Sequence, residues 1–83
     1  MKISVRYFAS VREALGRSGE TVETSARDLA ALRDELAARG GAYAQSLARG
    51  KAVRVALDQV MSEESALLRE GGEVAFFPPV TGG

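Results

Sequence analysis

The C-terminal segment carries the group of this chain that is best suited to chemistry. Its last two residues, Gly82 and Gly83, follow a stem of aromatic and proline residues, Phe76 to Thr81. Glycine has no Cβ atom, so this tip can enter a channel too narrow for any side chain. The tip presents one α-carboxylate, and we expect that carboxylate of Gly83 to be the reactive group.

The prolines of the stem predict an arm that leaves the folded domain. Pro78 and Pro79 cannot donate a backbone hydrogen bond, so the preceding strand is expected to end near Phe77. At about 3.3 Å per residue, residues 78–83 would extend roughly 20 Å, enough to enter another protein's active site. We therefore expect a domain over 1–77 and an extended arm over 78–83. The alternative is a frayed terminal stub.

Two phenylalanines predict a docking surface at the root of that arm. Residues 2–8 alternate between apolar and polar positions, which predicts a half-buried strand with Phe8 on the side away from the core. The same alternation over 73–77 places Phe77 on the outward side of the last strand. Two outward phenylalanines on neighbouring strands would form an apolar patch of the kind that marks interfaces. A register shifted by one residue would instead bury both side chains.

Lys51 is a further candidate for partner binding. It directly precedes the alternating segment 53–57, which predicts a third strand. Its ammonium group would pair with an acidic group of a partner or near the arm. The alternative is a solvated lysine, since exposed ion pairs contribute little to stability.

Composition excludes many other kinds of site. The chain has no Cys and no His, which excludes thiolate chemistry, disulfides and most transition-metal sites. Basic and acidic residues number 11 each, and this zero net charge argues against nucleic acid or an anionic membrane as the main partner. No signal-peptide pattern follows Met1 and no apolar run could span a bilayer, so we expect a cytoplasmic location. We expect no metal site and no bound cofactor.

Hydrophobic periodicity predicts the elements that must position the arm. The best helix is expected to begin at Ser25, with Asp28 completing an imperfect capping box, and to end at Gly40-Gly41. Its buried stripe would be Leu29, Leu32 and Leu36. A short helix over 9–15 would take Ser10 as its N-cap and end at Gly16. Further elements are expected as strands at 21–24 and 60–61, a short helix or turn at 42–48, and a helical turn at 65–68.

The order of these elements predicts the fold class. A two-stranded hairpin, a crossing helix and further strands form an α+β roll with a mixed sheet and one main helix across one face. This is the β-grasp, or ubiquitin-like, arrangement. In it the first and last strands are parallel neighbours at the centre of the sheet.

Specific motifs add a family resemblance that extends over the whole chain. Residues 72–83, with the stem Phe-Phe-Pro-Pro-Val-Thr before Gly-Gly, resemble the C-terminal signature of the small subunits of molybdopterin synthase, the MoaD type. Residues 5–13 resemble that family's first strand and helical turn, and Gly50-Lys51 also fits. A soft departure is Leu57-Asp58-Gln59, where the family often carries Asn before Gln. Gly-Gly alone is shared with other carriers, and the stem separates this subfamily from them.

The resemblance implies a sulfur carrier rather than a self-contained enzyme. An E1-like adenylyltransferase would adenylate the carboxylate of Gly83 with ATP, and a sulfur donor protein would convert the acyl-adenylate to a thiocarboxylate. The loaded arm would enter the large catalytic subunit, in a heterotetramer whose catalytic side chains belong to that subunit. Sulfur would pass to cyclic pyranopterin monophosphate to form the molybdopterin dithiolene. The residues implied to contact these partners are Phe8, Lys51, Phe77, Pro78, Pro79, Val80, Thr81 and Gly82.

Two other kinds of function stay open at this point. One is a sulfur carrier for thiamine synthesis or tRNA thiolation, against which the stem argues. The other is a ubiquitin-like modifier that forms amides with target proteins, or a plain interaction module.

Overall fold

The alternating segments of the chain form strands and the periodic ones form helices in this computed structural model, which describes residues 1–79. In chain order the elements are β1 (Lys2–Tyr7), α1 (Ala9–Leu15), β2 (Gly19–Glu23), α2 (Leu29–Ala37), α3 (Gly41–Leu47), β3 (Arg54–Leu57), β4 (Val60–Met61) and β5 (Glu73–Phe77).

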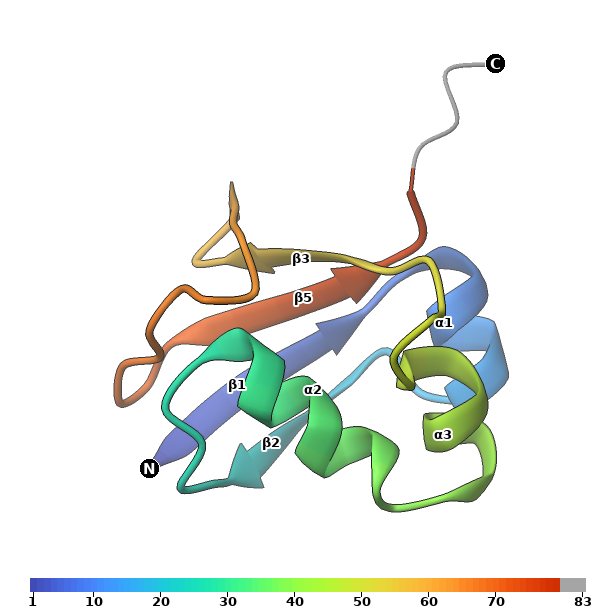
Figure 1. The fold of residues 1–83 in the computed structure, drawn as a ribbon, viewed down its shortest axis with the longest axis horizontal. Helices are drawn as coiled ribbons and strands as arrows, with labels where there is room; N and C mark the ends of the chain where they lie inside the picture. Colours follow the sequence, from blue (N-terminus) through green and yellow to red (C-terminus); the bar gives the residue numbers. More distant parts are fainter. Residues whose placement is uncertain (80–83) are drawn as a thin grey trace.

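The strands form one mixed sheet in the order β2-β1-β5-β3-β4. β1 and β5 are parallel neighbours at its centre, with Tyr7 opposite Phe76, whereas β2 pairs with β1 and β3 pairs with both β4 and β5 in antiparallel fashion. Figure 1 shows α2 crossing the sheet and α3 following it toward α1. The predicted α+β roll and its central parallel pair are therefore confirmed.

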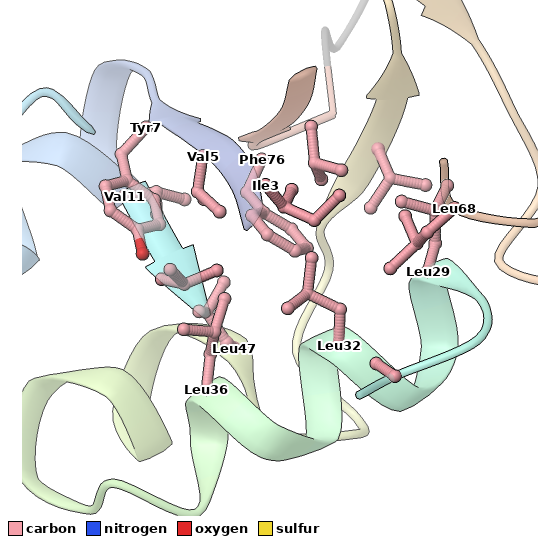
Figure 2. Packing of buried hydrophobic residues seen from close by; sticks show 14 residues of the cluster. Ile3, Val5, Tyr7, Val11, Leu29, Leu32, Leu36, Leu47, Leu68 and Phe76 are labelled. Atoms are coloured by element: carbon pink, nitrogen blue, oxygen red, sulfur yellow. The ribbon is translucent and has the colours of Figure 1, made fainter. Parts of the chain in front are cut away.

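The core lies between the leucine stripe of α2 and the inward face of the sheet (Figure 2). Leu29, Leu32 and Leu36 are at most 1% exposed, as the helical spacing predicts. Burying each large apolar side chain contributes roughly 1.5–3 kcal/mol before conformational entropy is set against it. The other side chains that are less than 2% exposed are Ile3, Val5, Tyr7, Leu47, Val74 and Phe76.

The main helix begins later than the sequence predicts. Asp28 is its N-cap residue, and its Oδ1 accepts a hydrogen bond from Ala31 N at 2.8 Å, so the capping box that starts at Ser25 is wrong. The Thr24 hydroxyl accepts a hydrogen bond from Ala26 N at 2.9 Å. That local bond gives the backbone at Ala26 a partner other than a helical one, so the residues just before Asp28 stay outside the helix.

Two other caps also differ from prediction. Helix α2 ends at Ala37, and Gly40, with φ of 79°, is the residue before α3 rather than the end of α2. Helix α1 takes Phe8 as its N-cap residue, without a side-chain cap, so the assignment of Ser10 to that position is wrong. The predicted end of α1 at Gly16 is confirmed by its left-handed conformation, φ 72°.

The predicted helical turn at 65–68 is also wrong. Leu67 forms an isolated antiparallel bridge with Asp28, and Leu68 N donates to Arg27 O at 2.9 Å. The turn in this region lies over 63–66, where Ala66 N donates to Glu63 O at 3.0 Å. Leu67 and Leu68 instead pair with the residues that lead into α2, a contact distant in sequence.

A polar cluster joins the N-terminal hairpin to the helices. The Glu20 carboxylate accepts hydrogen bonds from the hydroxyls of Tyr7 (2.8 Å) and Tyr43 (2.7 Å) and from Arg39 (2.9 Å). Burial alone would raise the pKa of Glu20, but the hydrogen bonds from Tyr43, Arg39 and Tyr7 outweigh it and lower the pKa to about 2. Burial, with the adjacent carboxylate, raises the pKa of Tyr7. The cluster thus fixes β1 and β2 against α3.

Glu20→Gln should lower stability near neutral pH and flatten its dependence on pH in acid. The pKa of Glu20 falls from 4.5 to about 2 on folding. This depressed value stabilises the fold above pH 4.5, and the stabilisation is lost as the pH falls from 4.5 toward 2. It is worth up to roughly 3 kcal/mol, at about 1.4 kcal/mol per tenfold change in proton affinity. Urea unfolding at a series of pH values measures it.

The matched control is Glu23→Gln, which removes an exposed carboxylate from the same strand. Its carboxylate is 70% exposed and faces only the N-terminal ammonium at 3.6 Å, so this variant should lose little stability at neutral pH. Equal acid slopes for the parent and Glu20→Gln would show that the cluster contributes no pH-dependent stability.

Candidate functional site

The root of the arm is built where the two central strands end together. β1 and β5 run parallel, so Phe8, just after β1, and Phe77, the last residue of β5, come to the same edge of the sheet. Phe8 N donates to Phe76 O at 3.1 Å, which fixes the two strand ends to each other. Tyr7 and Phe76 are at most 1% exposed and point into the core. Phe8 and Phe77 therefore lie on the opposite face, as the alternation predicts.

We call Phe8 and Phe77 the aromatic patch. Phe8 is 41% exposed and Phe77 is half-buried. The Arg6 guanidinium lies 5.9 Å from the centroid of the Phe8 ring, and Arg54 on β3 is the register partner of Phe77. Two arginines thus flank the patch, and the Arg6 contact has the geometry of a cation–π interaction. The structure shows where the patch lies, and its role in partner binding stays a prediction.

A strained backbone turn directs the chain from β1 into α1. Phe8 is extended, with φ −128° and ψ 155°, and Ala9 follows with φ 51°. A positive φ at a residue with a Cβ atom costs about 1–2 kcal/mol. Such strain persists where the surrounding structure enforces it. Here the turn separates the outward ring of Phe8 from helix α1, which is anchored in the core by Val11.

The stem begins as the prolines predict. β5 ends at Phe77, and the half-buried Pro78 and Pro79 follow it outside any strand. The rest of the predicted arm, 80–83, lies outside the described residues, including Val80, Thr81, Gly82 and the carboxylate of Gly83. The division into a domain over 1–77 and an arm over 78–83 therefore stays a prediction.

A pocket of about 260 Å³ opens beside Pro78, and we call it the arm-root pocket. Its walls come from Ser10 and Val11 of α1, from Gln45 and Ser46 of α3, from the segment 51–53 and from Pro78 itself. The structure thus brings the predicted site residue Lys51 to the first residue of the arm, although Lys51 and the aromatic patch were predicted from separate segments. The sequence did not indicate that this pocket exists.

Arg33 is a buried residue of the site that sequence reasoning missed. It is 5% exposed, and its guanidinium donates to the backbone oxygens of Leu47 (2.6 Å), Ala48 (3.0 Å) and Lys51 (2.9 Å). The fourth bond goes from Nη1 to Glu64 Oε2 at 2.7 Å. Arg33 therefore caps the C-terminal end of α3 and fixes the backbone at Lys51. Its spacing from the leucine stripe was the available signal, since it lies four residues after Leu29.

Residues 1–79 show neither a cluster of metal ligands nor a helix that could span a membrane. In that part of the chain no three His, Cys, Asp or Glu side chains gather in a way that could hold a metal ion. None of the helices described there is long and apolar enough to cross a membrane.

Comparison with known proteins assigns the chain to a family. The model of the ThiS family matches residues 5–83. The chain belongs to the ThiS family. Within that family it is 41% identical, over 81 residues, to the molybdopterin synthase sulfur carrier subunit of Escherichia coli K12. It is 37% identical, over 81 residues, to the protein of the same name from Haemophilus influenzae. Each match covers 98% of this chain and 99% of the relative, which confirms the resemblance carried by the motifs.

Solved structures share the fold of this ThiS-family chain. A Pyrococcus furiosus protein described as a putative molybdopterin converting factor, subunit 1, superimposes with a TM-score of 0.77 at 26% identity, covering 96% of this chain and 99% of that one. One chain of a complex between subunits 1 and 2 of the molybdopterin-converting factor from Helicobacter pylori matches with a TM-score of 0.69 at 24% identity, covering both chains fully. The predicted β-grasp fold is confirmed.

Proposed function

We propose that this chain is the sulfur carrier subunit of a molybdopterin synthase. The observation that carries the proposal is its identity of 41% and 37% to two relatives of that name, over nearly the whole length of each. The Phe-Phe-Pro-Pro-Val-Thr stem before Gly82 and Gly83 supports the same assignment. Thiamine-pathway carriers and protein modifiers share the terminal glycines, but the stem argues against assigning this chain to either class.

The chemistry is assigned to the carboxylate of Gly83. A carboxylate is a poor electrophile, because its oxygen is a poor leaving group. An E1-like adenylyltransferase would join that oxygen to the α-phosphorus of ATP and release pyrophosphate. The persulfide sulfur of a sulfur donor protein would then attack the acyl carbon and displace AMP. A thiol would next reduce the resulting acyl disulfide, forming a disulfide with the donor and releasing the thiocarboxylate. The thiocarboxylate would then transfer its sulfur to cyclic pyranopterin monophosphate, and two of these transfers would build one dithiolene. The acid–base groups for this step would belong to the large subunit.

The remaining residues of the site would bind and aim the arm. The aromatic patch, Phe8 and Phe77, would anchor the domain on the large subunit while the stem enters that partner. Stiffness from Pro78 and Pro79 lowers the conformational entropy lost on threading. The solved complex of subunits 1 and 2 from Helicobacter pylori is a precedent for a large-subunit partner. The same patch would serve the activating enzyme, so the two partners should exclude each other.

Two further parts of the proposal concern location and cofactors. We propose the cytoplasm as the location, because the activation step consumes ATP. The chain itself would bind no cofactor, and ATP would be bound by the activating enzyme.

Intact-mass analysis of the protein from sulfur-replete cells tests the function. Replacement of one terminal oxygen by sulfur supports a carrier, whereas a ladder of covalent adducts on other proteins would support a modifier. The thiocarboxylated chain, mixed with the candidate large subunit, should convert cyclic pyranopterin monophosphate to molybdopterin. Failure of this conversion, with sulfur delivered to a thiazole or a tRNA instead, would assign the chain to another pathway.

Phe77→Ala should weaken binding to the large subunit more than it lowers stability. Phe77 is half-buried on the outward face, so truncating it removes contact surface and leaves the core intact. We expect binding to fall by more than about tenfold, the loss typical of a well-packed aromatic anchor. Titration calorimetry measures the affinity and thermal unfolding measures the stability.

The adjacent substitution Phe76→Ala is the matched control. Phe76 is fully buried, so its truncation should cost about 3–5 kcal/mol of stability. If Phe77→Ala destabilises the fold as much as Phe76→Ala does, Phe77 is a core residue and the anchor role is wrong.

A further inference from the structure

The position of the arm-root pocket links it to any protein that takes up the arm. Helices α1 and α3 contact each other and lie side by side next to the chain that enters β3 (Figure 1). The pocket opens between these helices and Pro78. Pro78 is both a wall of the pocket and the first residue beyond β5, so a partner that binds the arm at its root would lie against the pocket.

The lining of the pocket is suited to an acidic group. Its polar lining residues are Ser10, Gln45, Ser46 and Lys51, and none of the eight lining residues that the structure describes is acidic. Each of these side chains can donate a hydrogen bond to a carboxylate oxygen. The bond from Lys51 would be charge-assisted and therefore stronger than a neutral one. The remaining lining residues, Val11, Ala52, Val53 and Pro78, are apolar.

The pocket is also held in shape before a partner arrives. Arg33 binds the backbone oxygens of Leu47, Ala48 and Lys51, so one buried side chain fixes the end of α3 and the segment that carries the ammonium group. A preformed receptor loses less conformational entropy on binding than a mobile one.

We propose that the arm-root pocket receives an aspartate or glutamate side chain of the large subunit, whose carboxylate pairs with Lys51 when the arm is bound. This inference rests on the proposed function, because it takes the large subunit as the protein that encloses the arm. A pocket of about 260 Å³ accommodates a side chain of that size. The contact adds a charged pair at the root of the arm, which orients the domain as the stem enters.

The test measures the affinity of the chain for its cognate large subunit as the charge at position 51 is changed. Lys51→Glu should weaken binding by at least about tenfold, because like charges across an interface are strongly unfavourable. Lys51→Gln should weaken it less and reduce the dependence of the association rate on salt. Lys51 is exposed, so both variants should keep the parent melting temperature.

Lys2→Glu is the matched control, since Lys2 is the chain's only other lysine and begins β1, at the opposite end from Phe8. It makes the same change in net charge and should bind within about twofold of the parent. Replacing acidic residues around the arm channel of the large subunit by lysine, one at a time, should identify one that restores binding of Lys51→Glu.

Several outcomes would overturn the inference. These are parent-like binding by Lys51→Glu, equal losses for Lys51→Glu and Lys2→Glu, or a loss confined to the activating enzyme. Failure to find a restoring lysine would also overturn it. Sulfur transfer by the parent protein is measured in parallel. If the parent transfers sulfur while Lys51→Glu binds normally, only the pocket contact is wrong, whereas an inactive parent contradicts the proposed function itself.

Discussion

A chain that lacks Gly83 is expected to lose sulfur loading completely and to unfold at the parent's melting temperature. Deletion moves the reactive carboxylate back to Gly82, about 3.3 Å short of its position in the activating enzyme. A displacement of about 1 Å can already cost a hundredfold in rate. The fold should be unaffected, because β5 ends at Phe77 and the core is complete within the described residues 1–79. Intact mass after incubation with ATP, activating enzyme and sulfur donor measures the loading.

Two matched changes separate the contributions of length, side chain and carboxylate. Gly83→Ala keeps the length and the carboxylate but adds a Cβ atom, so it should load slowly if the channel is as narrow as two terminal glycines imply. A chain that ends in an amide keeps both glycines and removes the acid, and it should not load at all. Cofactor synthesis by the amide, or unfolding caused by the deletion, would contradict the assignment of the chemistry to this carboxylate.

The fold was largely predictable, because local patterns and global packing agree. The alternation of Ile3, Val5 and Tyr7 matches the side-chain period of a strand, and these residues are at most 1% exposed. The start of α2 could not be predicted in the same way. Ser25 and Asp28 are both good caps, and two contacts favour Asp28: the local bond from Ala26 N to the Thr24 hydroxyl and the bridge from Asp28 to Leu67. Only the bridge is invisible to local reasoning.

The candidate site was predictable in part for similar reasons. The outward faces of Phe8 and Phe77 follow from strand alternation alone, and the structure bears both out. The arm-root pocket and the role of Arg33 depend on side chains and carbonyl groups far apart in the sequence. Arg33 could have been recognised from the sequence, because a charged residue next to the leucine stripe must find buried acceptors or it destabilises the fold. Glu20 gave no such signal, because its partners Tyr7, Arg39 and Tyr43 lie 13, 19 and 23 residues away in the sequence.

Arg33→Met should be among the most destabilising single substitutions in this domain. It removes the guanidinium donor from the backbone oxygens of Leu47 and Lys51, and it leaves Ala48 O with only its bond from Lys51 N. It also leaves the carboxylate of Glu64 without its ion-pair partner. Breaking a buried pair in this way costs about 3–5 kcal/mol, a large fraction of the 5–15 kcal/mol that stabilises a typical domain. Chemical denaturation measures the loss, and Arg33→Lys should recover only part of it, because an ammonium cannot reproduce the planar fork.

Arg49→Met is the matched control, because Arg49 also bonds a carboxylate, Asp34 at 2.9 Å, but does so in solvent. Exposed ion pairs contribute little, so this variant should melt close to the parent. The contrast between the two arginines is therefore a test of burial and of backbone contacts rather than of charge. Equal melting temperatures for Arg33→Met and Arg49→Met would mean that the segment up to Lys51 is held by the packing of Leu47 and the bond from Lys51 N to Ala48 O. The arm-root pocket would then owe its shape to the core and not to Arg33.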